Sequence, residues 1–319
     1  MRVDPGPLTW DAAVQTWHFD LVSAAVVTVL ATGYAWCYRR SRHAQHPVGA
    51  ANAACFGAGM LLWVVATISA IGAYAYVLFW VRALQILLLL YVVPFFVAQA
   101  KPVTVLRDAV GPVGRGRIDR MLATRFARAF LHPATTSMAM LATPWLLYLT
   151  PWYTAALQDE WIGAPTRILL VALGFGYFYA RLQEDPVPRR YPQSISLLIT
   201  VVEALADGVL GLVIWQGSLI GAAYYAALHR SWGPDARLDQ TIGAGVVWIL
   251  GDLVGWPFVL LLMRALSRDE KAHAIAVDAE LDEAESAKAH SVDGESETPA
   301  ASGLWWENDP ELRERFRRG

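Results

Sequence analysis

Cysteine is scarce in this chain, which has only Cys37 and Cys55 among its 319 residues. Two cysteines cannot build the disulfide framework of a small secreted domain, so that class is excluded. Charged residues make up only 17% of the chain, against about 25% in an average soluble domain. The sequence has no nucleotide-binding glycine loop, zinc-protease motif or nucleophile elbow. It also has no basic and aromatic cluster of the kind that binds nucleic acid, and residues 1–18 predict no cleavable signal peptide.

Long apolar runs are the main feature of the sequence. Hydrophobic residues make up 55% of the chain. They fall in runs of about 20 residues, the length at which a helix crosses a hydrocarbon core of about 30 Å. Seven such runs, bounded by polar residues, glycine or proline, cover residues 19–38, 52–71, 75–98, 134–155, 162–181, 194–216 and 241–264. The sequence therefore predicts an all-α, polytopic bundle of about seven transmembrane helices in a lipid bilayer.

Basic residues are distributed unevenly between the two sides of this predicted bundle. One set of connections carries fifteen of them: Arg39, Arg40, Arg42, Lys101, Arg107, Arg115, Arg117, Arg120, Arg125, Arg128, Arg181, Arg189, Arg190, Arg264 and Arg268. The opposite side carries only Arg2, Arg230 and Arg237. By the positive-inside rule, the N-terminus is predicted outside and the C-terminus in the cytoplasm.

The charge of the chain changes sign near its end. Residues 1–268 carry 20 Lys and Arg against 14 Asp and Glu, whereas residues 269–319 carry 6 against 14. The predicted parts are an outer N-terminal segment (1–18), a seven-helix transmembrane domain (19–268), an acidic disordered cytoplasmic linker (269–303) and a Trp-containing tail (304–319). Trp305 and Trp306 are candidates for docking on a partner or on the membrane surface. A free chain end is the alternative interpretation.

Five charged residues fall inside the predicted spans, where an unpaired charge costs at least about 2.5–3.5 kcal/mol. They are Arg82, Arg167, Glu203, Asp207 and Asp252. The i, i+4 spacing of Glu203 and Asp207 places both on one helix face. We expect one buried charge network between the third, fifth, sixth and seventh spans. It either fixes the helix register or forms a functional site for a ligand, an ion or a partner helix.

Cys37 and Cys55 lie near the predicted cytoplasmic ends of adjacent spans. Soft thiolates suit Cu(I), so the two cysteines are weak candidates for a metal site. Their interpretation as small packing residues is favoured. No other metal site is predicted from the residues.

Several short phrases follow one another in a fixed order along the chain. They are Trp17-His18-Phe19-Asp20, Leu84-Gln85 followed by Pro94-Phe95-Phe96 and Lys101-Pro102-Val103-Thr104, Pro151-Trp152-Tyr153, Asp185-Pro186-Val187-Pro188-Arg189-Arg190, Asp239-Gln240 with Gly243 and Gly245, and the tail from Trp305 to Pro310. Together they resemble the CtaG-like family of bacterial cytochrome c oxidase assembly factors, over most of residues 10–265. The resemblance implies a polytopic membrane factor that helps to deliver copper to the oxidase.

The chain departs from the family pattern where that pattern has histidines near the outer face. Arg82, Arg167 and Asp207 stand at these places. Imidazole is a good copper ligand, but guanidinium has no lone pair to give. Copper is therefore implied only by the family resemblance. We hypothesise that a former metal site has become a salt-bridged core.

The resemblance favours a non-enzymatic factor in cytochrome c oxidase assembly, located in the bacterial plasma membrane. Its expected partners are oxidase subunits or other assembly factors. One alternative is a structural or accessory subunit of a respiratory complex. The other is a membrane transporter of small ligands or anions that uses Arg82 and Arg167.

Overall fold

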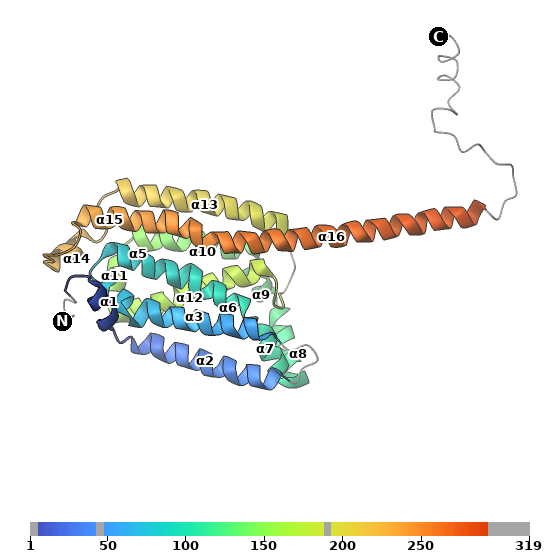
Figure 1. Cartoon of the computed structure of the whole chain (residues 1–319), viewed down its shortest axis with the longest axis horizontal. Coiled ribbons are helices and arrows are strands. Elements are labelled where there is room, and N and C mark those ends of the chain that lie inside the picture. Colours follow the sequence, from blue (N-terminus) through green and yellow to red (C-terminus); the bar gives the residue numbers. More distant parts are fainter. Residues whose placement is uncertain (1–5, 43–47, 188–192, 293–319) are drawn as a thin grey trace, which may run out of the picture. The chain divides into compact units, whose positions relative to one another are not determined.

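Helices account for the regular structure throughout the part of the chain that the computed structural model describes, residues 6–42, 48–187 and 193–292 (Figure 1). The chain divides into two units, Met1–Leu266 and Ser267–Gly319. The elements of the first unit, in chain order, are α1 (Trp10–Gln15), α2 (Leu21–Ser41), α3 (Ala50–Ile68), α4 (Ala70–Tyr74), α5 (Phe79–Leu87), the π-helix η1 (Leu88–Val92), α6 (Val93–Gln99), α7 (Pro102–Ala109), α8 (Gly111–Leu122), α9 (Arg125–Phe130), α10 (Pro133–Leu149), α11 (Trp152–Gln158), α12 (Glu160–Leu182), α13 (Gln193–Gln216), α14 (Ala222–Ala227), α15 (Ala236–Gly245), the π-helix η2 (Val246–Leu250) and the start of α16 (Gly251–Val292). The all-α prediction is confirmed.

Six helical segments are long and apolar enough to cross a membrane. They are Leu21–Ser41, Ala50–Ile68, Phe79–Gln99, Glu160–Leu182, Ser196–Gln216 and Ala236–Arg264. Each matches a span predicted from the sequence. The predicted fourth span corresponds to α10, which has 17 residues and a length of about 26 Å. A helix of that length lies at the lower limit for crossing the hydrocarbon core, so the count of seven depends on α10.

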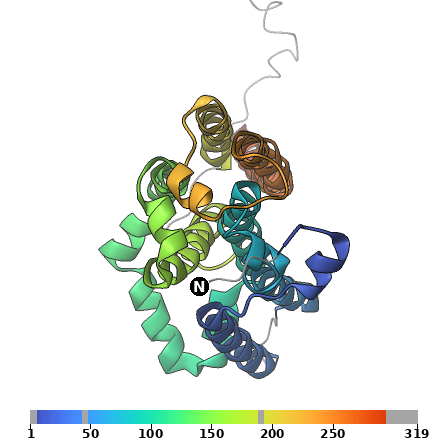
Figure 2. The same cartoon turned by 90° about the vertical axis from the view of Figure 1, so that its left-hand side faces the viewer.

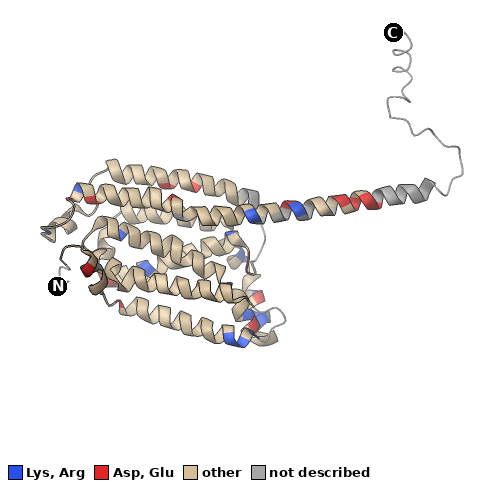
Figure 3. Cartoon of the chain, viewed as in Figure 1, with Lys and Arg blue, Asp and Glu red and all other residues tan. Residues whose placement is uncertain are grey.

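The long helices of the first unit lie side by side (Figures 1 and 2). The short helices α1, α11 and α14 lie at one end of this bundle, and α7, α8 and α9 lie at the other (Figure 1). Lys and Arg gather at the α7–α9 end (Figure 3). This is the end that the positive-inside rule predicts from the sequence to be cytoplasmic.

A close contact at Gly174 sets the packing of α12 against the third span. Pro94 has no N–H to donate to the helix ladder, and its ring conflicts with the carbonyl of Leu90 four residues earlier. The helix widens into η1 over this stretch. The Leu90 carbonyl then lies against Gly174, where a Cβ would overlap with the carbonyl oxygen and with the Pro94 ring. Glycine at residue 174 is therefore required for this approach of the two backbones.

Two buried carboxylates bind the free N–H groups at the starts of distant helices. Asp185 accepts hydrogen bonds from the backbone N–H of Val103 (2.9 Å) and Thr104 (2.8 Å), at the start of α7. Asp239 does the same for Phe79 (3.1 Å) and Trp80 (3.0 Å), at the start of α5. The first N–H groups of a helix have no partner within it, so each aspartate satisfies them and ties two remote segments together.

The described part of the second unit is helical. The sequence predicts a disordered linker over 269–303, whereas α16 continues to Val292. The physical reason is composition, since this stretch is rich in Ala and Glu, which have high helix propensity. Residues 293–303 and the predicted tail at 304–319, with Trp305 and Trp306, lie outside the described residues.

Candidate functional site

Arg167 is the centre of an ion-pair cluster at the α1 end of the bundle. Its side chain is almost fully buried. Its Nε lies 2.9 Å from Oδ2 of Asp20, its Nη2 pairs with Glu160, and its Nη1 donates to the Tyr76 hydroxyl at 3.1 Å. Two carboxylates thus neutralise one guanidinium and connect the starts of α2 and α12. Sequence reasoning missed Asp20 and Glu160 because both lie at the ends of predicted spans.

Arg82 is 1% exposed, and its neighbours are mostly uncharged. Its Nη1 donates to Oε1 of Gln85 at 2.6 Å, and Gln85 in turn donates to the Ala66 carbonyl at 2.7 Å. The hydroxyl groups of Tyr148 and Tyr153 also lie in its surroundings. Among the described residues, no carboxylate forms an ion pair with Arg82. The predicted pairing of Arg82 with the carboxylates of α13 is not found.

Arg181 supplies the cation for Glu203. The sequence assigns Arg181 to a cytoplasmic connection, but its side chain is fully buried in the last turn of α12. Its Nη1 lies 2.6 Å from Oε2 of Glu203 and 2.6 Å from the Tyr177 hydroxyl. The same Glu203 oxygen accepts from Tyr177 at 2.7 Å. The only signal in the sequence was that Arg181 ends the predicted fifth span.

Glu203, Asp207 and Asp252 lie together in a second polar region, away from Arg167. All three line a pocket of about 350 Å³ between α12, α13 and α16. The Tyr91 hydroxyl donates to Asp207 at 2.9 Å. The structure therefore divides the five predicted charges: the three carboxylates meet in this pocket, whereas Arg82 and Arg167 have other partners. The single network predicted from the sequence is wrong in its pairings.

Arg82 and Arg167, at two of the three expected metal positions, do not fit copper. A guanidinium cannot ligate a metal, and Arg167 already engages Asp20 and Glu160. Cys37 is buried against the apolar side chains of Val105 and Ala109, and the described ranges contain no group of three metal-binding side chains around either cysteine. Arg167 and its two carboxylates thus form a salt-bridged core at one of these positions.

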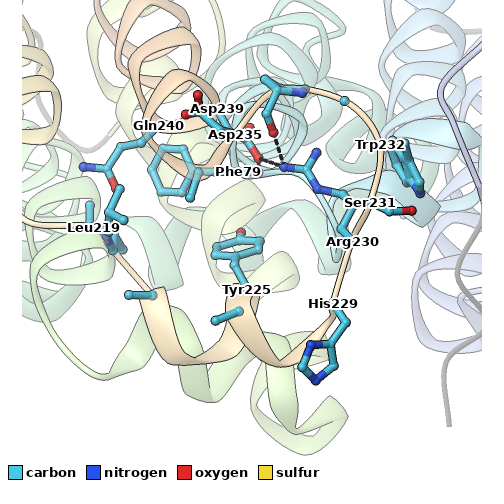
Figure 4. A pocket seen from close by; sticks show the side chains of 16 residues that line it. Phe79, Leu219, Tyr225, His229, Arg230, Ser231, Trp232, Asp235, Asp239 and Gln240 are labelled. Carbon is cyan, nitrogen blue, oxygen red and sulfur yellow. Dashed lines mark hydrogen bonds and ion pairs between the residues drawn. The ribbon is translucent and has the colours of Figure 1, made fainter.

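A second pocket, of about 480 Å³, opens at the α14 end of the bundle (Figure 4). The Phe79 and Tyr225 rings lie between Gln240 on one side and Arg230 on the other (Figure 4). Arg230 donates from Nη2 to the Pro234 carbonyl at 2.5 Å and lies 3.4 Å from Asp239. Burial raises the pKa of the Tyr225 hydroxyl well above its ordinary value, so this phenol stays protonated. Asp239 and Gln240 form one of the phrases that carry the family resemblance, but the sequence predicted no site there.

Gln240 closes the floor of this pocket with backbone contacts. Its amide nitrogen donates to the carbonyls of Ile214 (2.7 Å) and Ser218 (3.0 Å), and its oxygen accepts from the Ile220 N–H at 2.8 Å. The connection between α13 and α15 is therefore held at both ends, by Gln240 and by the Arg230–Asp239 pair. It contains the short helix α14, which is too short to span the membrane.

Comparison with known proteins gives one family and three relatives. The sequence model of the cytochrome c oxidase caa3 assembly factor family, Caa3_CtaG, matches residues 32–269. Uncharacterized proteins of Mycobacterium bovis and Mycobacterium tuberculosis are each 27% identical over 289 residues, which are 87% of this chain and 43% of the relative. An uncharacterized protein of Mycobacterium leprae is 25% identical over 275 residues, 83% of this chain and 42% of the relative. The chain thus spans less than half the length of these curated relatives, and no solved structure matches it.

Proposed function

The chain belongs to the cytochrome c oxidase caa3 assembly factor family, and from this premise we propose that it assists oxidase assembly as a non-enzymatic membrane scaffold. It acts in the bacterial plasma membrane as a multi-pass protein. Its partners are oxidase subunits or other assembly factors. It holds no copper of its own at the positions of Arg82, Arg167 and Asp207.

The Arg167 cluster is the observation that carries this proposal. At a position where the family pattern expects a histidine, the chain has a buried guanidinium with two carboxylates around it. Such a group stabilises the arrangement of α2 and α12 and leaves no lone pair for a metal. The membrane scaffold is retained while its metal chemistry is replaced by ion pairs.

The same cluster weighs against Arg167 as the cation of an anion transporter, whereas Arg82 has no carboxylate partner among the described residues but is 1% exposed. An anion site needs a cation that the ligand can reach, and the Arg167 guanidinium is already paired with Asp20 and Glu160.

The alternative of an accessory subunit is distinguished by co-purification. A subunit remains with the fully assembled oxidase, whereas an assembly factor is recovered with intermediates.

Gene deletion in the native host tests the proposal directly. We expect the amount of assembled oxidase, measured by its haem absorbance in membranes, to fall on deletion and to be restored by the wild-type gene on a plasmid. Excess copper in the medium should not restore the assembled oxidase, because added copper cannot replace a protein scaffold. Normal oxidase levels in the deletion strain would overturn the proposal, and full rescue by copper alone would point to copper delivery.

A further inference from the structure

The pocket of Glu203, Asp207 and Asp252 has one side formed by α13 and the other by the first turns of α16. α13 packs against α15 and η2, in the half of the bundle that carries α14. Beyond η2, the pocket lies between α13 and residues 251–259 of α16, and Tyr91 and Tyr177 also line it. This groove lies near the middle of both spans, at membrane depth.

The groove carries an excess of negative charge. Three carboxylates line it, and Arg181 is the cation paired with one of them, Glu203. The second carboxylate oxygen of Glu203, Oε1, is buried and has no hydrogen-bond partner. Asp252 has neither a hydrogen bond nor an ion pair within the described ranges. Carboxylates at this depth are costly unless a cation compensates them.

The rim of the groove is apolar and has the shape of a helix-packing surface. Val201 on α13 is 56% exposed and Trp256 on α16 is 62% exposed. Gly251 and Gly255, one turn apart on α16, line the groove with Ala204 on α13. Small residues with this spacing allow a neighbouring helix to approach closely in a bilayer.

We propose that this groove, which we call the α13–α16 groove, receives a transmembrane helix of a partner protein that carries a Lys or Arg near its middle. The cation of that helix pairs with Asp252, and its small-residue face packs on Gly251 and Gly255. The inference rests on the proposed function, since it makes the partner a membrane subunit or assembly factor.

Charge complementarity selects this occupant over the others. The phosphate group of a lipid is anionic and is repelled by the three carboxylates. A second copy of this chain offers no suitable cation, because the described spans expose no Lys or Arg away from their ends. Arg82 and Arg167, which do lie at membrane depth, are buried within the bundle.

Photo-crosslinking in native membranes tests the proposal. A photo-reactive amino acid is placed at Val201, on the rim of the α13–α16 groove. The matched control is Leu61, which is 65% exposed and belongs to α3, a helix that contributes no residue to the lining of the groove. We expect Val201 to give a crosslinked peptide from a transmembrane helix with a Lys or Arg near its middle, and Leu61 to give lipid adducts.

Charge variants in the same membranes decide whether the cation matters. Asp252→Asn should lower the Val201 crosslink at least about fivefold, and Asp252→Glu should retain it. Asp252 is suited to this test because it holds no other side chain in place, whereas Glu203 holds Arg181. Crosslinks to lipid alone, to a second copy of the chain, or to a helix without a basic residue would overturn the proposal, as would an undiminished crosslink in Asp252→Asn.

The identity of the crosslinked protein separates this inference from the proposed function. A basic helix from an oxidase subunit or assembly factor supports both. A basic helix from a protein unrelated to the oxidase supports the α13–α16 groove as a binding site for a basic helix, and it contradicts the proposed function in oxidase assembly. If gene deletion lowers the amount of oxidase but Val201 gives no crosslink to a basic helix, the proposed function is supported. The proposal that the α13–α16 groove binds a basic helix is then contradicted.

Discussion

Arg167 and Asp20, 147 positions apart in the sequence, form a buried ion pair with an Nε to Oδ2 distance of 2.9 Å. Asp20 also caps α2 by accepting a hydrogen bond from the Ser23 N–H at 3.0 Å. One carboxylate therefore both starts the first long helix and fixes it against α12. The connection is made where a charge is most expensive to leave unpaired.

The Asp20→Asn variant should be markedly less stable than the wild type. It leaves Arg167 buried with Glu160 as its one remaining carboxylate, and loss of one partner of a buried pair costs about 3 kcal/mol. The readout is the midpoint of thermal unfolding in detergent, with Asp11→Asn, an exposed carboxylate in α1, as the control. An Asp20→Asn midpoint equal to that of Asp11→Asn would show that the ion pair contributes nothing.

Arg181 and Arg82 are both buried arginines, but their replacement by methionine should affect the yield of folded protein differently. Arg181→Met leaves Glu203 without its cation and should lower the yield of folded protein strongly. Arg82→Met leaves no ion pair broken, only the hydrogen bond to Gln85, and should be tolerated. Size-exclusion profiles of the two variants in detergent give the measurement. The reverse order of yields would contradict the assignment of Glu203 to Arg181.

Gly174→Ala should disrupt the packing of α12, because the added methyl group overlaps with the Leu90 carbonyl oxygen. A residue forced into a filled helix contact costs about 1–3 kcal/mol or more. Gly176→Ala is the matched control two positions along the same helix, where a Cβ meets open space. The thermal midpoint should fall in the first variant and stay constant in the second. Equal effects would mean that the close contact at Gly174 is not formed.

Asp185 gives a prediction on pH. Burial raises the pKa of its carboxyl, although hydrogen bonds from Thr104 and Val103 and the charge of Lys101 act in the opposite direction. Since the folded-state pKa exceeds the unfolded one, the contribution of Asp185 to stability is greatest at low pH and is lost as pH rises through the folded pKa. The wild-type midpoint, relative to that of Asp185→Asn, should therefore be lower at about pH 7.5 than at about pH 4.5. The opposite result is a wild-type midpoint that rises with pH relative to that of Asp185→Asn. It would show that the N–H groups at the start of α7 stabilise the ionised carboxylate more than burial destabilises it.

The copper content of the purified protein follows from its ligand set. We expect well below one copper per chain, because two of the three former histidine positions hold guanidinium groups, which cannot ligate a metal, and only Asp207 remains as a donor. Elemental analysis of the wild type and of a Cys37→Ser, Cys55→Ser variant provides the measurement. One copper per chain in both proteins would contradict the lost-metal hypothesis, and copper lost only in the variant would assign it to the cysteines.

The helical spans could be predicted from sequence because a run of apolar residues has only one stable form in a bilayer. The pairing of the charges could not. Arg181 and Glu160 lie at the ends of apolar runs. At such positions the sequence does not show whether a residue belongs to the helix or to the connection that follows or precedes it. Which face of α12 meets α2 depends on contacts such as that of Gly174 with Leu90, and a linear pattern does not contain them.

The family phrases were recognisable in the sequence, but their physical role was not. Asp20, Asp185 and Asp239 each stand in one of these phrases. In the structure each accepts backbone hydrogen bonds at a helix start. A carboxylate that caps a distant helix has no signature at its own position, because its partner lies 82 residues away for Asp185 and 160 away for Asp239.

These remote caps constrain the order in which the chain matures during synthesis. A ribosome delivers the N-terminal helices first, so the starts of α5 and α7 enter the membrane region before the aspartates that cap them have been made. Asp185 arrives only after the predicted fifth span and Asp239 only at the last. The start of α7 therefore lacks these hydrogen bonds until Asp185 has been made, and the start of α5 lacks them until Asp239 has been made with the last span.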